Sequence, residues 1–320
     1  MNDLFNLNRK IVLSAPMAGY TNDIYRRFAR RFGADLVFTE MISADGLVYS
    51  TERTLELMKF SDEEKPIGIQ FFTADPDIMY KAALMIRDSG FSVLDLNFGC
   101  PVRKVTKRGA GSSLLKSSEL AIEIVSAAME SNIPVSVKVR CGFNSCDEWG
   151  ETLELLEKLE NLGVSFITIH PRSARQMFSG KSDWSLIADA VNKLHIPIIG
   201  SGDLFSIDDV VKMVETANVA GVSIARGGIA NFEIFTQVRA FFENKAIPKF
   251  DFYNRVETMR EFIAEEFESY GEDIASKWCR KFLVKLTKNI PDASSFRRRL
   301  SYIRTLDDVN SFLDDILSRV

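Results

Sequence analysis

Short apolar runs rich in β-branched residues recur along the first 225 residues, and longer amphipathic segments separate them. Runs of this length bounded by turn residues predict strands, whereas apolar residues repeated at i, i+3 and i+4 predict one buried face of a helix. The predicted strands are Ile11–Ala15, Asp35–Phe38, Ile67–Phe71, Val93–Asn97, Val135–Val139, Phe166–Ile169, Ile196–Gly200 and Val219–Ala225. The clearest predicted helices between them are Asp77–Ser89, Leu120–Ser131, Glu151–Leu162 and Ile207–Glu215.

Eight strands that alternate with helices are typical of a (β/α)8 TIM barrel, which is an α/β fold. The competing architecture is a doubly wound sheet, which usually opens with a G-x-G-x-x-G turn after its first strand. The sequence has no such turn after Ile11–Ala15. We therefore predict a barrel.

After Ala230 the strand pattern ends and only helical periodicity remains. It predicts a small all-helical domain after the barrel, joined to it through Ala246–Phe250. We place the barrel at residues 1–243 and the helical domain at residues 244–320. Its predicted helices are Phe252–Tyr270, Asp273–Lys288, Ser294–Tyr302 and Asp307–Ser318.

The net charge of −4 conceals two basic segments. Ser276–Arg304 carries nine Lys and Arg against the single acid Asp292, and Pro101–Lys116 carries five with no acid. Such patches favour contact with nucleic-acid phosphates. No apolar run reaches the ~18 residues that a membrane span needs, and the first ten residues lack the apolar stretch of a signal peptide. We expect a cytoplasmic protein that does not bind membranes.

The four cysteines, Cys100, Cys141, Cys146 and Cys279, are too few and too scattered to predict a disulfide framework. Only two histidines are present, so the ligands for a metal site are scarce and we expect none.

Polar and small residues gather where the predicted strands end, which is where barrel enzymes carry their chemistry. Small residues after the last two strands, Ser201-Gly202-Asp203 and Ala225-Arg226, expose backbone N–H groups and a cation to a phosphate. Turn glycines without function are the alternative there. The other strand ends carry Pro16-Met17-Ala18, Glu40, Gln70, Asn97 to Cys100, Lys138 with Arg140, and His170.

Each of the sharper residues has a purely structural alternative. Lys138 could pair with Glu40 or Asp95, and His170 could be a satisfied core histidine. Cys100 could be a small buried apolar residue, but the cations that follow it in sequence, beginning with Arg103 and Lys104, would favour a reactive thiolate. No histidine is near it in sequence to serve as a base, which argues against a cysteine hydrolase.

The segments APMAGYTND, NFGCPVRKV, VKVR, ITIHPRSARQMFSGKSDW, IIGSGD and ARGG resemble the tRNA-dihydrouridine synthase family, in the family's order, over residues 14 to 228. The resemblance implies FMN as cofactor, NADPH or NADH as reductant, and reduction of the 5,6-double bond of uridines in tRNA. Hydride would pass from flavin N5 to uracil C6, and Cys100 would give the proton to C5. The helical domain would bind the tRNA.

The resemblance also implies a role for each matching residue. Around the flavin ring it places Pro16, Met17, Ala18, Gln70, Lys138 and His170, and around the flavin phosphate Ser201, Gly202, Asp203, Ala225 and Arg226. Toward the tRNA it places Asn97, and we add Arg140 and the basic residues Arg103, Lys104, Arg297, Arg298 and Arg299. Ser201 replaces a common Asn, and Pro171 follows His170 where the family usually has Gly.

Three other functions compete with this one: a flavin-dependent barrel reductase of a free pyrimidine of the dihydroorotate type, a non-redox barrel that binds a sugar phosphate, and a tRNA-binding protein with an inactive site. The basic helical segment argues against the first, and the second would be colourless. We expect a monomer with no obligate protein partner.

Overall fold

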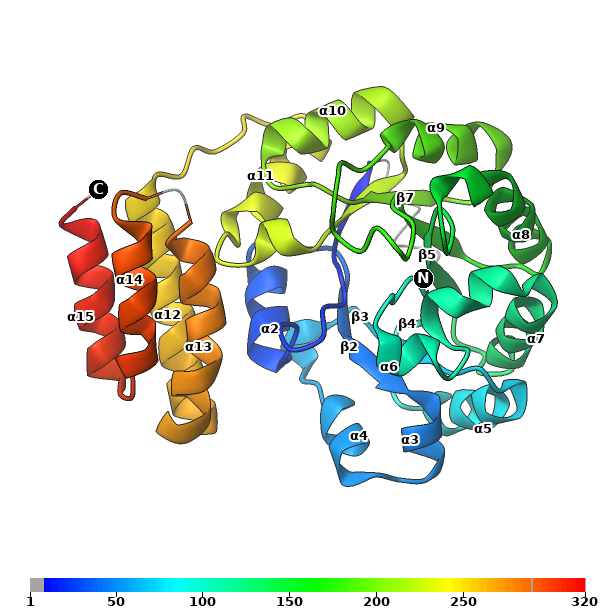
Figure 1. The fold of residues 1–320 in the computed structure, drawn as a ribbon, viewed down its shortest axis with the longest axis horizontal. Coiled ribbons are helices and arrows are strands. Elements are labelled where there is room, and N and C mark those ends of the chain that lie inside the picture. Colours follow the sequence, from blue (N-terminus) through cyan, green and yellow to red (C-terminus); the bar gives the residue numbers. More distant parts are fainter. Residues whose placement is uncertain (1–8, 289, 320) are drawn as a thin grey trace.

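The computed structural model describes residues 9–288 and 290–319, and it contains the predicted barrel (Figure 1). All strands pair in parallel, in the order β1-β8-β7-β6-β5-β4-β3-β2. A parallel bridge between Leu13 and Leu36 joins the first and second strands and closes the ring. The strands are β1 (Ile11–Ser14), β2 (Val37–Ser43), β3 (Ile67–Phe72), β4 (Val93–Phe98), β5 (Val135–Arg140), β6 (Phe166–His170), β7 (Ile198–Ser201) and β8 (Gly221–Ile224).

Helices surround the strands, and the four predicted barrel helices are confirmed to within three residues at each end. The surrounding helices are α2 (Asp23–Arg31), α5 (Pro76–Ile86), α7 (Ser118–Met129), α8 (Trp149–Asn161), α9 (Trp184–Lys193), α10 (Ile207–Ala217) and α11 (Glu233–Phe242). Three short helices lie in the loops that follow β2 and β4, namely α3 (Ala44–Val48), α4 (Glu52–Leu57) and α6 (Arg103–Thr106).

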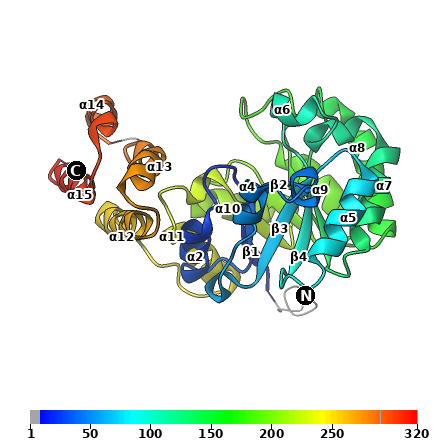
Figure 2. The same ribbon diagram turned by 90° about the horizontal axis from the view of Figure 1, so that it is seen from below.

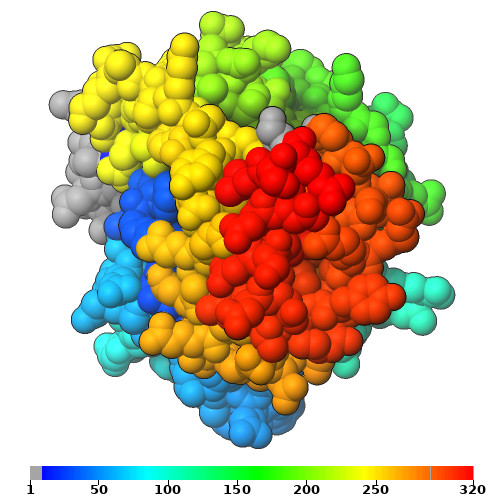
Figure 3. All heavy atoms as spheres, turned by 90° about the vertical axis from the view of Figure 1, so that its left-hand side faces the viewer, coloured from blue at the N-terminus to red at the C-terminus, as the bar shows by residue number. Residues whose placement is uncertain are grey.

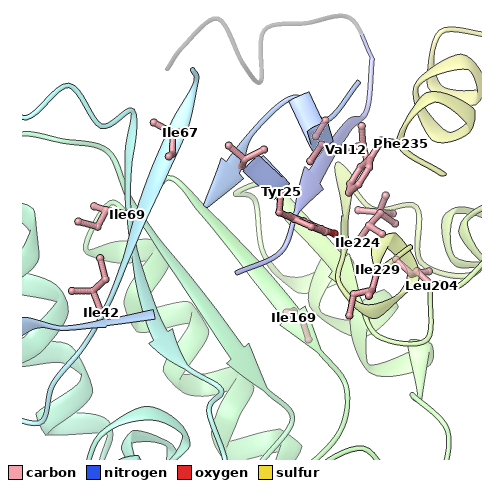
Figure 4. Close-up of a cluster of buried hydrophobic side chains, with 14 of the residues drawn as sticks. Val12, Tyr25, Ile42, Ile67, Ile69, Ile169, Leu204, Ile224, Ile229 and Phe235 are labelled. Atoms are coloured by element: carbon pink, nitrogen blue, oxygen red, sulfur yellow. The ribbon is translucent and has the colours of Figure 1, made fainter. Parts of the chain in front are cut away.

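Alternation along the strands builds two apolar layers. Ile11 and Leu13 pack inside the barrel with Phe166 and Ile199, whereas Val12 belongs to the large cluster between strands and helices. Figure 4 shows this outer cluster, with Val12 and Tyr25 among its members. Successive side chains of a strand point to opposite faces, so every second residue enters the barrel.

The same alternation brings charged residues to the barrel interior on β5. Val135, Val137 and Val139 belong to the outer cluster, so the residues between them, Ser136, Lys138 and Arg140, face inward. One face of β5 therefore packs against the helices, and the other carries two of the predicted site residues, Lys138 and Arg140.

The C-terminal region forms the predicted helical domain beside α2 and α11 (Figures 1 and 2). Asp251 accepts a hydrogen bond from the Asn254 N–H at the start of its first helix, and Gly271, with φ +72°, ends it. Viewed from the side on which the helical domain lies, this domain covers much of the molecule (Figure 3). Its elements are α12 (Phe252–Tyr270), α13 (Glu272–Leu286), α14 (Ala293–Arg299), the 3₁₀ turn η5 (Leu300–Tyr302) and α15 (Leu306–Leu317).

Aromatic packing joins the helical domain to the barrel. Tyr25 and Phe28 of α2 meet Phe282 of α13 and Phe262 of α12, with ring centroids 6.2 and 5.3 Å apart respectively. The buried apolar cluster is therefore continuous across the predicted boundary at residues 243 and 244, which lies in the connection between α11 and α12. Among the described helices, none is both long and apolar enough to cross a membrane.

One expectation about the cysteines is wrong, because Cys141 and Cys146 form a disulfide with their Cα atoms 5.1 Å apart. The chain folds back sharply after β5, and Glu148 accepts hydrogen bonds from the N–H groups of Phe143 and Asn144. A side chain at Gly142 would meet the Ser145 carbonyl at 2.2 Å, so glycine permits this turn. Cysteine spacing in sequence did not reveal a contact that the turn creates.

The seam between β1 and β8 should tolerate no side chain at Gly221. A Cβ there would lie 2.4 Å from the Ile11 carbonyl oxygen, so Gly221→Ala should lower the free energy of unfolding by about 1–3 kcal/mol. Gly150 in α8 has nothing within 4 Å of such an atom, and Gly150→Ala should raise stability by about 0.5 kcal/mol. Urea unfolding of both variants measures the free energy of unfolding. If the two variants were equally stable, the close contact that closes the barrel between β1 and β8 would be contradicted.

Candidate active site

A row of polar side chains crosses the barrel interior on adjacent strands. Register pairs Gln70 with Asp95 and Asp95 with Ser136. The Gln70 amide donates to Asp95 at 2.6 Å, and the Ser136 hydroxyl donates to its other oxygen at 2.6 Å. Burial nevertheless raises the pKa of Asp95 to about 6. The row continues from Gln70, whose carbonyl oxygen accepts from the Asn97 amide at 2.8 Å.

Asn97 fixes the loop that carries Cys100. Its side-chain oxygen accepts the backbone N–H groups of Gly99 at 3.2 Å and of Cys100 at 2.8 Å. Ser112 then holds the Cys100 carbonyl with both its N–H and its hydroxyl, at 3.1 and 2.9 Å. Gly111, with φ +64°, is required here because a Cβ would lie 2.8 Å from that carbonyl oxygen. The loop is thus tied on both sides.

The environment of Cys100 favours a thiol. The side chain is 8% exposed and packs with Val105 and Ala110. Burial raises the pKa of the thiol, while the Val102 N–H and the charge of Arg140 lower it less. The predicted thiolate is therefore wrong: Arg103 and Lys104 are exposed and do not contribute to the shift, because neighbours in sequence need not be neighbours in space.

Lys138 faces the barrel mouth from β5 without a partner among the residues that the structure describes. It forms neither of the ion pairs considered for it, and Glu40 instead accepts the Gly19 N–H at 2.6 Å. Burial lowers the pKa of Lys138 to about 8, and Asp95 offsets part of this shift. An unpaired, partly buried ammonium is costly, so the site suits a bound group with negative or electron-rich atoms.

Arg140 ties three loops together. Its guanidinium donates to the carbonyls of Gly99, Ser173 and Met177 at 2.7, 2.9 and 2.9 Å. Burial lowers its pKa to about 10. Within the described chain its Nη2 has no partner, so this nitrogen is the part of Arg140 that can reach a substrate. Holding the cysteine loop is a role that the sequence did not suggest.

Arg172 is the residue that sequence analysis missed. It is 1% exposed and donates to the Asp203 carboxylate at 2.5 Å, to the Gly180 carbonyl at 2.7 Å and to the Ser182 hydroxyl at 3.0 Å. It thereby joins the loops after β6 and β7. Its only signal in the sequence was its place two residues after a strand-end histidine, next to the unusual Pro171.

His170 is neutral at physiological pH. Burial and the nearby cations Lys138, Arg140, Arg172 and Arg226 lower its pKa well below 6.5. The Arg172 guanidinium lies 3.2 Å from the His170 Nε2 and can only donate, so Nε2 accepts and the ring hydrogen sits on Nδ1.

The loops after β7 and β8 carry the residues predicted to bind a phosphate. Among the described residues, the backbone N–H groups of Gly202, Asp203 and Leu204 donate to no protein group. Gly202 has φ +105°, and a Cβ there would lie 2.5 Å from the Ser182 hydroxyl. Arg226 lies 3.3 Å from Asp203. The Ser201 hydroxyl is less available, because it is buried and donates to the Ser223 carbonyl at 3.0 Å.

The remaining predicted residues form two groups. One lies beside this mouth, and the other lies in the helical domain, away from it. Met17 accepts the N–H groups of Tyr20 and Thr21, which shapes the Pro16-Met17-Ala18 turn after β1. Arg103 and Lys104 lie on α6, directly after the cysteine loop. Arg297, Arg298 and Arg299 lie on α14 in the helical domain, and the structure does not bring them to the barrel mouth.

This arrangement defines a β/α-barrel with a cation-rich mouth and a protonated cysteine. Solved barrels of similar fold include a 2-naphthoyl-CoA reductase, with a TM-score of 0.55 at 13% identity over 73% of this chain and 50% of that one. An old yellow enzyme homologue from Zymomonas mobilis gives 0.51 at 11% identity, over 77% and 92%.

The model of the dihydrouridine synthase (Dus) family matches residues 13–320. A probable tRNA-dihydrouridine synthase of Aquifex aeolicus is 32% identical over 98% of both chains. One from Mycobacterium tuberculosis (strain CDC 1551 / Oshkosh) is 33% identical over 95% of this chain and 81% of its own length. The chain belongs to the dihydrouridine synthase family.

Membership in this family implies a flavin cofactor, and the residues of the mouth fit one. Lys138 has no partner for its charge, and the free N–H groups of Gly202, Asp203 and Leu204 can bind a phosphate. A flavin carries both an electron-rich ring edge and, as its mononucleotide, a phosphate.

The raised pKa of Cys100 predicts slow alkylation. Since iodoacetamide attacks the thiolate, labelling should be slower than for a free cysteine near pH 7 and should accelerate only at a more alkaline pH than for a free cysteine. Mass spectrometry of labelled peptides across this range measures it. Cys279, whose burial raises its pKa to about 12, serves as an internal control that stays unlabelled. Fast labelling of Cys100 at neutral pH would contradict the protonated state.

Proposed function

We propose that this chain is a tRNA-dihydrouridine synthase that reduces the C5=C6 bond of uridines in tRNA, with FMN as its flavin and NADPH or NADH as the reductant. The observation that supports this most directly is the Cys100 thiol, which burial keeps protonated and which Asn97 and Ser112 hold in place. A protonated thiol is the form that can donate a proton.

The flavin would be held by residues from six strand ends. Flavin bound in the mouth supplies hydride for C6 of the uracil ring. Lys138 and neutral His170 would contact its pyrimidine edge, where the Lys138 charge would stabilise negative charge on the ring. The turn after β1 and Gln70 would line the ring, and the free N–H groups after β7 would hold the phosphate together with Arg226; this set comprises Pro16, Met17, Ala18, Gln70, Ser201, Gly202, Asp203, Ala225 and Arg226.

Cys100 completes the reduction as a general acid. Gain of a hydride at C6 leaves an electron pair on C5 and the adjoining carbonyl, and this pair takes the thiol proton as the S–H bond breaks and a C5–H bond forms. The thiolate that remains is stabilised by the Val102 N–H and by Arg140. The free Nη2 of Arg140 and the second amide hydrogen of Asn97 can donate to the uracil carbonyls.

The tRNA would be held by exposed basic side chains, because the target uridine must leave its stack to enter a barrel mouth. Arg103, Lys104, Arg297 and Arg298 are exposed and form no ion pair within the described chain. Arg299 differs, since it pairs with Asp315 of α15. Phosphate binding by the first four would leave the fold of the helical domain unchanged.

Removal of the acid should separate binding from catalysis. Cys100→Ala should retain flavin and tRNA affinity but lower the rate of dihydrouridine formation by about 10²–10⁴-fold. Nucleoside mass spectrometry of an unmodified tRNA transcript measures the product. Cys279→Ala, which removes the other free thiol, should keep wild-type turnover. Equal rates for Cys100→Ala and wild type would remove Cys100 from the mechanism.

Charge reversal on α14 should weaken tRNA binding without affecting the cofactor. The double variant Arg297→Glu, Arg298→Glu should raise Kd for tRNA about tenfold or more and lower the salt slope by about 2, because two phosphate contacts are lost. Oxidation of NADPH in the absence of tRNA should not change. The matched control, Lys81→Glu with Lys212→Glu on the outer barrel helices, changes net charge equally and should leave Kd unaltered.

A further inference from the structure

Two exposed phenylalanines flank one arginine at the rim of the barrel mouth. Phe178, in the loop after β6, is 54% exposed, and Phe205, in the loop after β7, is 44% exposed. The Arg226 guanidinium lies 4.7 Å from the Phe178 ring centroid and 5.3 Å from that of Phe205. Lys288, just after α13, lies 5.8 Å from Phe205. We call Phe178 and Phe205 with Arg226 the aromatic platform.

The loop that carries Phe178 is held rigidly although its side chain is exposed. Arg140 donates to the Met177 carbonyl, and buried Arg172 donates to the carbonyls of Ser179 and Gly180. Met177 has φ +51°, in a left-handed region that few non-glycine residues adopt. Two buried cations thus hold the backbone on both sides of Phe178, and its ring is exposed to solvent.

The charge around the mouth is divided between its two sides. Near the platform, Arg175 and Lys181 are exposed on the Phe178 loop, in addition to Arg226 and Lys288. Beside the β1 and β2 ends lies a cleft of about 1240 Å³ that reaches Gly19 and Glu40. Its lining holds seven acids, Asp23, Glu40, Glu52, Glu56, Asp62, Glu63 and Glu64, against four basic residues, Arg26, Arg27, Arg53 and Lys59. A polyanion is favoured on the platform side.

We propose that the aromatic platform stacks an unpaired base of the RNA strand next to the target uridine; this rests on the proposed function. Single-stranded RNA is bound through bases that stack on aromatic rings while cations track the backbone. The Arg226 guanidinium lies beside both rings and holds them in place through cation–π contacts. Lys288 and Arg175 supply the positive charge for the adjoining phosphates. The platform lies on the loops that shape the catalytic mouth, so a base stacked there would adjoin the one that enters.

The experiment replaces each ring in the flavin-loaded enzyme and measures tRNA affinity and cofactor reduction separately. Phe178→Ala and Phe205→Ala should each raise Kd for an unmodified tRNA transcript about tenfold, with an unchanged salt slope because stacking releases no counterions. Flavin content and the rate of flavin reduction by NADPH without tRNA should not change. Tyr80→Ala on α5, which removes a ring that is also 44% exposed, is the control and should bind tRNA as wild type does.

Substitutions at Phe178 distinguish stacking from apolar burial. Phe178→Trp should retain wild-type affinity for tRNA, whereas Phe178→Leu should lose as much tRNA affinity as Phe178→Ala. Unchanged tRNA affinity in both alanine variants would overturn the platform. Slower flavin reduction by NADPH with unaltered tRNA affinity would also overturn it, by assigning the rings to the reductant. A wild-type enzyme that neither binds tRNA nor forms dihydrouridine would overturn the proposed function itself.

Discussion

The gathering of positive charge at the barrel mouth is the constraint on which the rest of the site depends. Lys138, Arg140, Arg172 and Arg226 converge there, and Arg172 and Arg226 share the carboxylate of Asp203. Cations in a low-dielectric interior are costly unless they are solvated by the protein. Backbone carbonyls of the loops after β4 and β6 solvate Arg140 and Arg172, and the Asp203 carboxylate ties the loop after β7 to Arg172, so these loops have defined shapes. Within the described chain, Lys138 alone of these four has neither a hydrogen-bond nor an ion-pair partner, which leaves its ammonium available to a ligand.

The helical domain takes part in shaping the turn after β1 at this mouth. Lys281 of α13 donates to the Gly19 carbonyl in the turn after β1, and Asn22, which caps α2, donates to Glu266 of α12 at 2.8 Å. Burial raises the pKa of Glu266 to about 7. Because the apolar core also runs from α2 into α12 and α13, the helical domain and the turn after β1 are held in one fixed relation.

The polar row from Asp95 through Gln70 to Asn97 links the barrel interior to the cysteine loop. Each amide in the row has its oxygen and nitrogen assigned by its partner, so Asn97 presents its oxygen to the Cys100 backbone and not its nitrogen. Burial then keeps the thiol protonated. A rigid, uncharged thiol is the form that can give a proton to a substrate carrying negative charge, and the Val102 N–H and Arg140 would stabilise the thiolate left behind.

Much of this protein follows from its sequence alone. Periodicity located all eight strands and every helix of the C-terminal domain, because alternation and the 3.6-residue repeat are local properties of the chain. Since parallel strands of a barrel end at one rim, the strand-end residues Gln70, Asn97, Lys138 and His170 could be grouped from their positions in the sequence. The tertiary structure decided what depends on distance through space: the disulfide of Cys141 with Cys146, the buried role of Arg172, the unpaired charge of Lys138 and the protonation of Cys100. Burial and contact between residues remote in sequence set these properties, and no local pattern encodes them.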